Sequence, residues 1–285
     1  MSLSRSRARH GVSVLGPTDL PDFIGLAGRN PVVNAFAEYR ARSTHLEPRL
    51  LAGEMWGRYD AGQLVAACHV GANLVPVECT EDDAQAFAER ALTRPRSVVT
   101  IVGLQDQVWP MWDCLSDTWG PSREARWDQP HLELARAPLV APDPLVRQTT
   151  PDDFDALYPA CVAMYTEEVG VDPEAEGGAP IYRSRVRQLI GLGWSFARIE
   201  QGRVVFKAEV AHATSRAAQI QGVWVAPERR GHGLAAAGVA AVAAACRREI
   251  APVASLYVNV WNEPARRAYA RVGFEQTGTF ATIMF

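Results

Sequence analysis

A glycine-rich turn in the second half of the chain is the feature best suited to bind an anion. Residues 220–235 read IQGVWVAPERRGHGLA, and the pattern predicts a strand that leads through a turn into a long helix. The first N–H groups of a helix lack intrahelical acceptors and carry the positive end of its dipole. Gly231 and Gly233 would let a ligand approach without a Cβ in the way. The turn therefore predicts a phosphate or diphosphate site.

The spacing of this turn separates it from two common phosphate-binding motifs. A lone Gly-x-Gly is also typical of a simple tight turn, the third glycine of the dinucleotide-binding fingerprint is missing, and no Lys-Ser/Thr follows as in a P-loop. Instead, Arg230-x-x-Gly233-x-Ala235 resembles the acyl-CoA pyrophosphate loop of the GNAT superfamily of N-acetyltransferases.

A second motif lies downstream in the expected order. Residues 262–274, NEPARRAYARVGF, resemble the Asn-x-x-Ala-x-x-x-Tyr-x-x-x-Gly-Phe signature of the same superfamily, and one helix and one strand fit between the two motifs. The resemblance covers residues 145–285. The whole chain is similar to tandem GNAT proteins, in which a degenerate N-terminal copy precedes a catalytic C-terminal one.

The resemblance implies which residues hold the co-substrate, acetyl-CoA. Backbone groups of Val223 and Val225 would pair with the pantetheine arm, and Asn262, which also reads as a helix cap, could hydrogen-bond the same arm. The diphosphate would accept from the N–H groups of six consecutive residues: Arg230, Gly231, His232, Gly233, Leu234 and Ala235. We expect His232 to contribute its backbone, with its imidazole facing solvent.

Tyr269 matches the general acid of the superfamily, which protonates the departing thiolate of CoA. A phenol with a pKa of about 10 is a suitable donor to a thiolate whose conjugate acid has a pKa of about 8.5. The structural alternative is a half-buried tyrosine on an amphipathic helix.

Glu209 is the candidate base for an acceptor that arrives as an ammonium ion. Lys207 and Glu209 share one face of a predicted strand, and Gln221 could face the same side from the next strand. A plain ion pair with Lys207, the only lysine in the chain, explains Glu209 equally well. Glu167 and Glu168 are alternative acids for the acceptor site, although acids at a helix end are commonly just solvated.

Composition argues against several other functions. The 285 residues are 48% hydrophobic with a formal net charge of −3, which is globular and not basic enough to suggest a nucleic-acid partner. The longest apolar stretch, within Leu234–Cys246, is mainly alanine, so no membrane partner is expected. The five cysteines contain no C-x-x-C pair, so no disulfide framework and no metal site is indicated, and a reducing cytoplasm fits best.

The element pattern predicts an α/β (α+β) fold, a GNAT-like mixed and mostly antiparallel sheet flanked by helices, in two tandem copies. We predict a disordered tail over residues 1–10, a degenerate GNAT-like domain over 11–137, a proline-rich linker over 138–144 and a catalytic domain over 145–285. Residues 274–285 read as a closing pair of strands bent at Gly278. Where the first copy should have its own phosphate turn, no arginine followed by Gly-x-Gly or Gly-x-Ala occurs, which predicts lost CoA binding.

These expectations together predict an acyl-CoA-dependent N-acyltransferase, which transfers groups other than aminoacyl groups. The expected reaction passes acetyl from acetyl-CoA to the amine of a small molecule, peptide or protein by direct attack. Two alternatives stay open: a mycothiol synthase-like small-molecule acetyltransferase, and a non-catalytic acyl-CoA-binding regulatory module. A homodimer is also left open.

Overall fold

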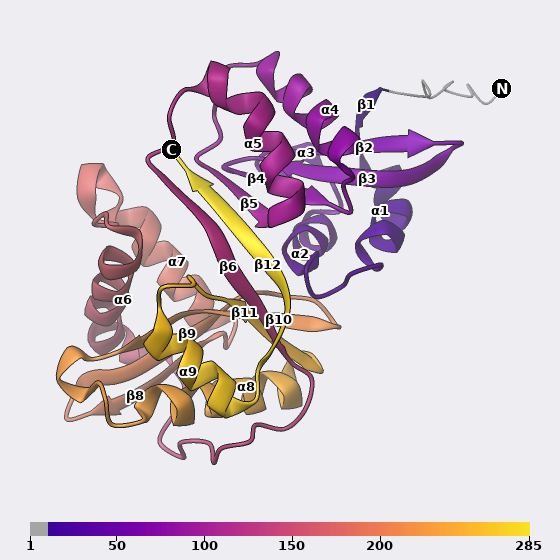
Figure 1. The fold of residues 1–285 in the computed structure, drawn as a ribbon. Coiled ribbons are helices and arrows are strands. Elements are labelled where there is room, and N and C mark those ends of the chain that lie inside the picture. Colours follow the sequence, from indigo (N-terminus) through magenta and orange to yellow (C-terminus); the bar gives the residue numbers. More distant parts are fainter. Residues whose placement is uncertain (1–10) are drawn as a thin grey trace. The chain divides into compact units, whose positions relative to one another are not determined.

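The computed structural model describes residues 11–285, and the predicted tail over residues 1–10 lies outside the described residues. The chain divides into two compact units (Figure 1). The first unit holds the described residues up to His131 together with Gly278–Phe285, and the second holds Leu132–Thr277. Over residues 11–285, no helix has both the length and the apolar character needed to cross a membrane.

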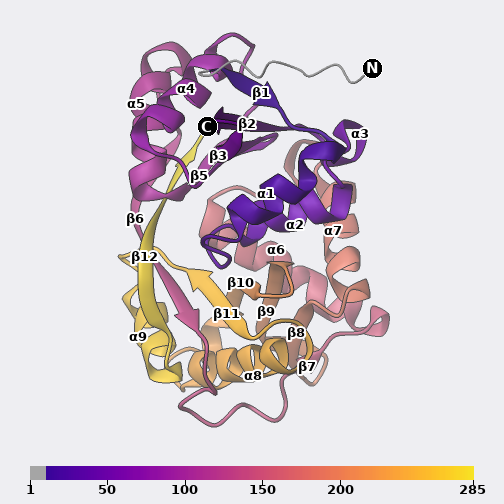
Figure 2. The same cartoon turned by 90° about the vertical axis from the view of Figure 1, so that its right-hand side faces the viewer.

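The second unit is a sheet with helices on both faces. Its strands are β7 (Arg147–Gln148), β8 (Ser195–Glu200), β9 (Arg203–Ala213), β10 (Ala217–Val225) and β11 (Val253–Tyr257), and its helices are α6 (Phe154–Val169), α7 (Ala179–Gly191), α8 (Leu234–Glu249) and α9 (Glu263–Val272). The strand order is β11-β10-β9-β8-β7, with β10 and β11 parallel and the other pairs antiparallel. Figure 2 shows this sheet between α8 and α6.

The second unit has one hydrophobic core on each face of its sheet. Phe206, Ala208 and Val210 alternate along the strand and pack into the core beneath α8 and α9. A separate core joins α6 and α7 to the opposite face of the sheet. The hairpin between β8 and β9 turns at Gln201 and Gly202, whose φ values of 49° and 75° suit a turn that matches the twist of the strands.

The first unit repeats the same order of elements. Its strands are β1 (Val12–Val14), β2 (Glu54–Asp60), β3 (Gln63–Val70), β4 (Asn73–Val77) and β5 (Thr100–Leu104), and its helices are α1 (Leu20–Ala27), α2 (Ala35–Thr44), α3 (Pro48–Leu51), α4 (Glu81–Leu92) and α5 (Gln105–Trp119). One core lies under α4 and α5 and another under α1 and α2. Two long strands, β6 (Glu124–Leu134) and β12 (Glu275–Met284), close the two copies of this order.

The predicted closing pair of strands at the C-terminus is wrong. β12 runs as a single strand through Gly278, which has no positive φ and therefore makes no tight turn. Its last five residues, Phe280–Met284, pair antiparallel with β5 in the first unit.

The compact units do not coincide with the predicted domain limits. The chain enters the second unit within β6 and returns to the first within β12. The proline-rich segment predicted as a linker lies in the second unit, where Leu139 N–H donates to the Val272 oxygen and Asp143 N–H donates to the Ala237 oxygen. The predicted limits follow the repeat of elements, whereas the compact units follow the packing.

Candidate functional site

The turn between β10 and α8 presents unpaired backbone donors at the start of a helix. Gly231 and Gly233 have φ values of 79° and 80°, and a Cβ added to either would meet no atom within 4 Å. Within residues 11–285, no protein atom accepts a hydrogen bond from the backbone N–H groups of Gly231 to Ala236. Because these donors gather at the positive end of the α8 dipole, the turn fits a diphosphate.

The edge of β10 beside this turn is open. β10 pairs with β11 only through Ala217, Ala218 and Gln219, and over the described residues no further pair joins them, although β10 stays paired with β9 as far as Val225. The next residue, Ala226, donates its N–H to the Val205 oxygen on β9, so the alternating backbone groups of Val225 point the other way. The two strands therefore splay, and an extended ligand could add to β10.

The side chain of Arg230 lies on this edge. Its Nε donates to the Val225 carbonyl oxygen (3.0 Å), and its Nη2 donates to Glu167 Oε2 at the end of α6 (2.7 Å). The hydrogen bond from Arg230 lowers the pKa of Glu167. Arg230 was predicted as a backbone donor to the diphosphate, but its N–H already donates to the Pro227 oxygen (3.3 Å). No pattern in the sequence indicates that its guanidinium holds the carbonyl predicted to meet pantetheine.

The remaining residues of the predicted loop are placed around this helix start. His232 is exposed, as expected of a residue that contributes its backbone, and Leu234 and Ala235 are half-buried in the first turn of α8. Asn262 caps α9, since its side-chain oxygen accepts from Ala265 N–H (3.2 Å). The contact of Asn262 with pantetheine stays a prediction.

Tyr269 lies on α9 in mainly apolar surroundings. It is 7% exposed, and its ring centroid is 6.0 Å from that of Phe274. Burial raises the pKa of Tyr269, and the negative charge of Glu168 raises it further. The phenol therefore keeps its proton at neutral pH, as a general acid must.

Lys207 and Glu209 form a buried ion pair on β9. Lys207 is fully buried, and its Nζ donates to Glu209 Oε2 (2.9 Å), while Gln221 Nε2 donates to Glu209 Oε1 (2.9 Å). Burial alone would lower the pKa of Lys207, but Glu209 and Cys161 outweigh it, so the pKa is raised and the ammonium stays charged. The ion pair that the sequence left as an alternative for Glu209 is formed, and a catalytic role for this carboxylate stays a prediction.

Gly222 belongs to this site and was not selected from the sequence. It lies in a β-bulge between Gln221 and Trp224, where its φ is 58°. A Cβ at Gly222 would lie 3.1 Å from Lys207 Nζ and 3.3 Å from Glu209 Cδ. The signal was available, because a lone glycine inside a predicted strand favours a bulge or a close approach.

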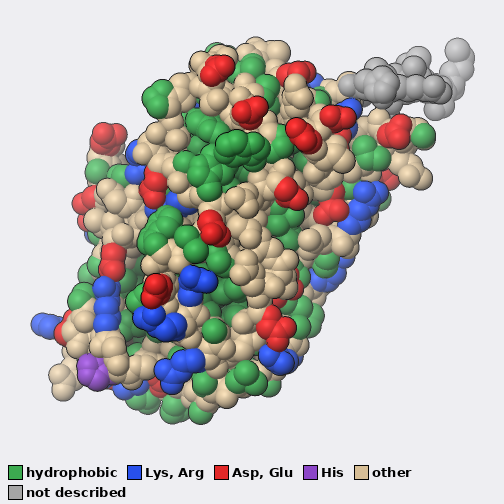
Figure 3. Space-filling model, in the orientation of Figure 1, with side chains coloured by type: hydrophobic (Ala, Val, Ile, Leu, Met, Phe, Trp, Pro, Cys, Tyr) green, Lys and Arg blue, Asp and Glu red, His purple; other side chains and the backbone are tan. Residues whose placement is uncertain are grey.

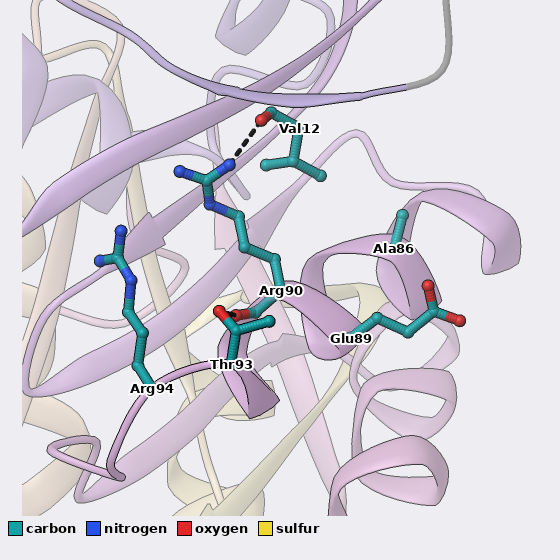
Figure 4. Close-up of a pocket in the computed structure, with 6 residues that line it drawn as sticks. All are labelled: Val12, Ala86, Glu89, Arg90, Thr93 and Arg94. Carbon is teal, nitrogen blue, oxygen red and sulfur yellow. Dashed lines mark hydrogen bonds between the residues drawn. The ribbon is translucent and has the colours of Figure 1, made fainter.

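Two prominent surface features lie outside the predicted site. A cavity of about 570 Å³ in the first unit is lined by Arg90 and Arg94 among others, and Arg90 Nη1 donates there to the Val12 oxygen (Figure 4). Apolar side chains gather on the face of the first unit that carries α5 (Figure 3), where Trp109 is 54% exposed and meets Trp127 at a centroid distance of 4.8 Å.

The N-terminal copy has a different helix start at the equivalent place. Thr80 caps α4 by accepting from Asp83 N–H, and Asp83 Oδ2 accepts in return from Thr80 N–H (3.0 Å). The first turn of α4 carries three acids, Glu81, Asp82 and Asp83. Because its own carboxylate already occupies this helix start, the copy does not offer a diphosphate site like that of α8.

Comparison with known proteins agrees with the repeated architecture. Residues 181–274 match the acetyltransferase (GNAT) family, and residues 53–157 match a family described as a domain of unknown function (DUF4081). No curated protein sequence matches the chain significantly.

Solved GNAT structures are similar over nearly the whole chain. A GNAT-family acetyltransferase from Colwellia psychrerythraea has a TM-score of 0.57 at 14% identity, with 96% of this chain and 99% of that one covered. A tandem GNAT protein from the clavulanic acid biosynthesis pathway has a TM-score of 0.57 at 16% identity, with 95% and 97% covered. A GCN5-related N-acetyltransferase from Sphaerobacter thermophilus has a TM-score of 0.59 at 17% identity, with 97% and 95% covered. Residues 181–274 thus belong to a GNAT acetyltransferase domain, in a chain that has the fold of tandem GNAT proteins.

Proposed function

We propose that this protein is an N-acyltransferase that passes acetyl from acetyl-CoA to an amine by direct attack. The observation that carries the proposal is the group of unpaired N–H donors from Gly231 to Ala236, beside an open edge of β10. In CoA, a diphosphate is joined to an extended arm that carries amide groups. The start of α8 would bind the diphosphate, and the neighbouring edge of β10 would bind the arm.

The residues of the second unit have separate tasks in the proposed reaction. Acetyl-CoA supplies an activated thioester, the start of α8 binds its diphosphate, and Val223 and Val225 bind its arm. The Val223 N–H polarises the acyl carbonyl. The acceptor nitrogen forms the new C–N bond as the C–S bond breaks. Glu209 takes one proton from an ammonium acceptor before the attack, and Tyr269 protonates the departing thiolate. The second proton, which nitrogen loses as the amide forms, restores the Tyr269 hydroxyl, and Glu209 passes its proton to solvent.

The class of acceptor separates the main proposal from its alternatives. An enzyme for a small-molecule acceptor, such as a mycothiol synthase-like enzyme, would differ only in its acceptor pocket. A regulatory module would bind acyl-CoA without turnover.

The five cysteines of the chain are free in the structure, which supports the proposal of a reducing cytoplasm.

Calorimetric titration with CoA tests the proposed binding site. Gly233→Ala places a Cβ at the start of α8, so we expect CoA affinity to fall at least about tenfold, or about 1.4 kcal/mol. Gly62→Ala is the matched control, because Gly62 also has a positive φ of 85° and open space for a Cβ, but lies in the first unit. Equal affinity in wild type and Gly233→Ala would contradict the proposed site.

A screen of amines with acetyl-CoA, followed by thiol release, tests catalysis. Release that depends on the amine, with an N-acetylated product identified by mass, supports the transferase. CoA binding without turnover of any amine would favour the regulatory module instead, and the spectrum of active amines distinguishes small-molecule from peptide acceptors.

A further inference from the structure

The single lysine of the chain lies beneath the β10 bulge. Lys207 is fully buried, and β10 and β9 set it opposite Trp224, directly after the bulge residues Gly222 and Val223. The 3.1 Å between its Nζ and a Cβ built on Gly222 places the ammonium against the backbone at the point where the thioester carbonyl would be polarised.

Contacts around the ammonium hold it in place without using all of its hydrogens. Nζ donates to Glu209 Oε2 (2.9 Å) and interacts with the Cys161 thiol on α6. These two contacts leave the third ammonium hydrogen without an acceptor among residues 11–285. The Met164 methyl group, 3.1 Å from the same Cβ position on Gly222, covers the bulge from α6.

Stability alone does not account for this arrangement. Removing two charges from water costs free energy that their attraction seldom exceeds, and well-packed apolar residues commonly stabilise such a position as well or better. Gly222 cannot carry a side chain without meeting the pair, and its left-handed φ adds strain for any other residue. The pair and the bulge therefore depend on one another.

We propose that Lys207 is a positioning residue for acyl transfer, whose ammonium lies beside Gly222 and supplies positive potential where the acyl carbonyl oxygen gains negative charge. This inference rests on the proposed function. In the reaction, the electron pair of the carbonyl π bond moves onto oxygen as the amine attacks and returns when the thiolate leaves, so Lys207 neither gains nor loses a proton. Glu209 keeps the buried ammonium neutralised between turnovers.

A pair of variants isolates the charge of Lys207. Lys207→Met alone leaves the Glu209 carboxylate buried and unpaired, so the informative comparison is between Glu209→Gln and the double variant Lys207→Met/Glu209→Gln. Glu209→Gln removes a charge that keeps the buried Lys207 protonated, so both variants are measured across pH. At low pH, where the ammonium is charged, we expect the double variant to show a kcat at least tenfold below that of Glu209→Gln, with unchanged affinity for CoA. Should this variant fail to fold, Lys207→Leu/Glu209→Leu gives the same comparison with an apolar pair.

Binding without turnover gives a second measurement. The thioester carbonyl distinguishes acetyl-CoA from CoA, so the ratio of their dissociation constants reports on the carbonyl site. We expect Glu209→Gln to keep the wild-type ratio and the double variant to shift it toward one. Arg198→Met/Asp143→Asn neutralises another ion pair of the second unit, 2.8 Å apart, and should leave the ratio and kcat unchanged.

The outcomes separate this inference from the proposed function. Wild-type protein that binds neither acetyl-CoA nor CoA would overturn both. Wild-type protein that binds and transfers acetyl, together with a double variant that retains the kcat of Glu209→Gln and the wild-type binding ratio, would overturn the role of Lys207 alone.

Discussion

At the residue scale, Tyr269 is the clearest test of chemistry as opposed to binding. Tyr269→Phe removes the hydroxyl and keeps the ring that packs beside Phe274, so the fold should be retained. A positioned general acid contributes about 10² to 10⁴ in rate, and we expect kcat to fall by about a hundredfold with CoA affinity unchanged. Steady-state kinetics with calorimetry measures both, and a variant with wild-type kcat would show that Tyr269 is not the acid.

The surroundings of Tyr269 also determine how the rate depends on pH. Its acid role requires the protonated form, so the rate falls as pH rises through its pKa. Burial and then Glu168 raise that pKa above the ordinary value of about 10. We therefore expect kcat to show no alkaline decline from this group until above pH 10. Loss of rate between pH 8 and 9 that disappears in Tyr269→Phe would contradict this.

Motif spacing predicted the start of α8 and the position of Tyr269, but not the side-chain partners. Both motifs are local in sequence, and helix geometry fixes the placement of residues within them. The bond of Arg230 to Glu167 joins residues 63 positions apart, and Gly222 matters because a lysine from the neighbouring strand approaches it. Such contacts depend on strand register and helix packing, which a residue pattern does not specify.

At the element scale, the hydrogen bond between Arg230 and Glu167 joins the turn before α8 to α6. The guanidinium also occupies the Val225 oxygen, so a bound pantetheine arm must compete with it. We expect Glu167→Gln to free the arginine and increase CoA affinity by about three- to fivefold, within the range of about 0–1 kcal/mol for an exposed pair. Calorimetric titration at low and high salt checks this, because screening should shrink the gain.

A nearby acid provides the control for this prediction. Glu228 is an exposed carboxylate in the same turn, and Glu228→Gln removes an equal charge without touching the bond of Arg230. If both variants raise CoA affinity equally, the loss of one negative charge explains the effect, and the hydrogen bond between Arg230 and Glu167 has no specific role.

Element boundaries were predictable where capping residues mark them. Thr80 and Asn262 begin α4 and α9, and Gly273 ends α9 in a left-handed conformation, so these boundaries carry signals that are visible in the sequence. β6 carries a weaker signal, since Pro130 and several charged residues interrupt its pattern. β12 was divided at Gly278 because its pairing with β5 lies far away in sequence.

At the scale of the whole molecule, the two copies share one order of elements but differ in the chemistry of one helix start. In the second unit the donors before α8 are unpaired, whereas in the first unit Thr80 accepts from Asp83 N–H and the Asp83 carboxylate lies at the same helix start. Pro76 lacks an N–H on the equivalent strand, β4, and its ring lies 3.1 Å from a Cβ built on Gly103 in β5. The first copy therefore has a capped, acidic helix start and lacks one N–H on the strand before it, in contrast to the second.

This difference predicts one CoA site per chain. Calorimetric titration of the full chain should give a stoichiometry of one, and Gly233→Ala should weaken all of the binding instead of half of it. Asp83→Asn, which removes one carboxylate from the start of α4, should leave the stoichiometry at one because Glu81, Asp82 and Pro76 remain. Two equivalents bound by wild type, of which Gly233→Ala retains one at full affinity, would show that the N-terminal copy also binds CoA.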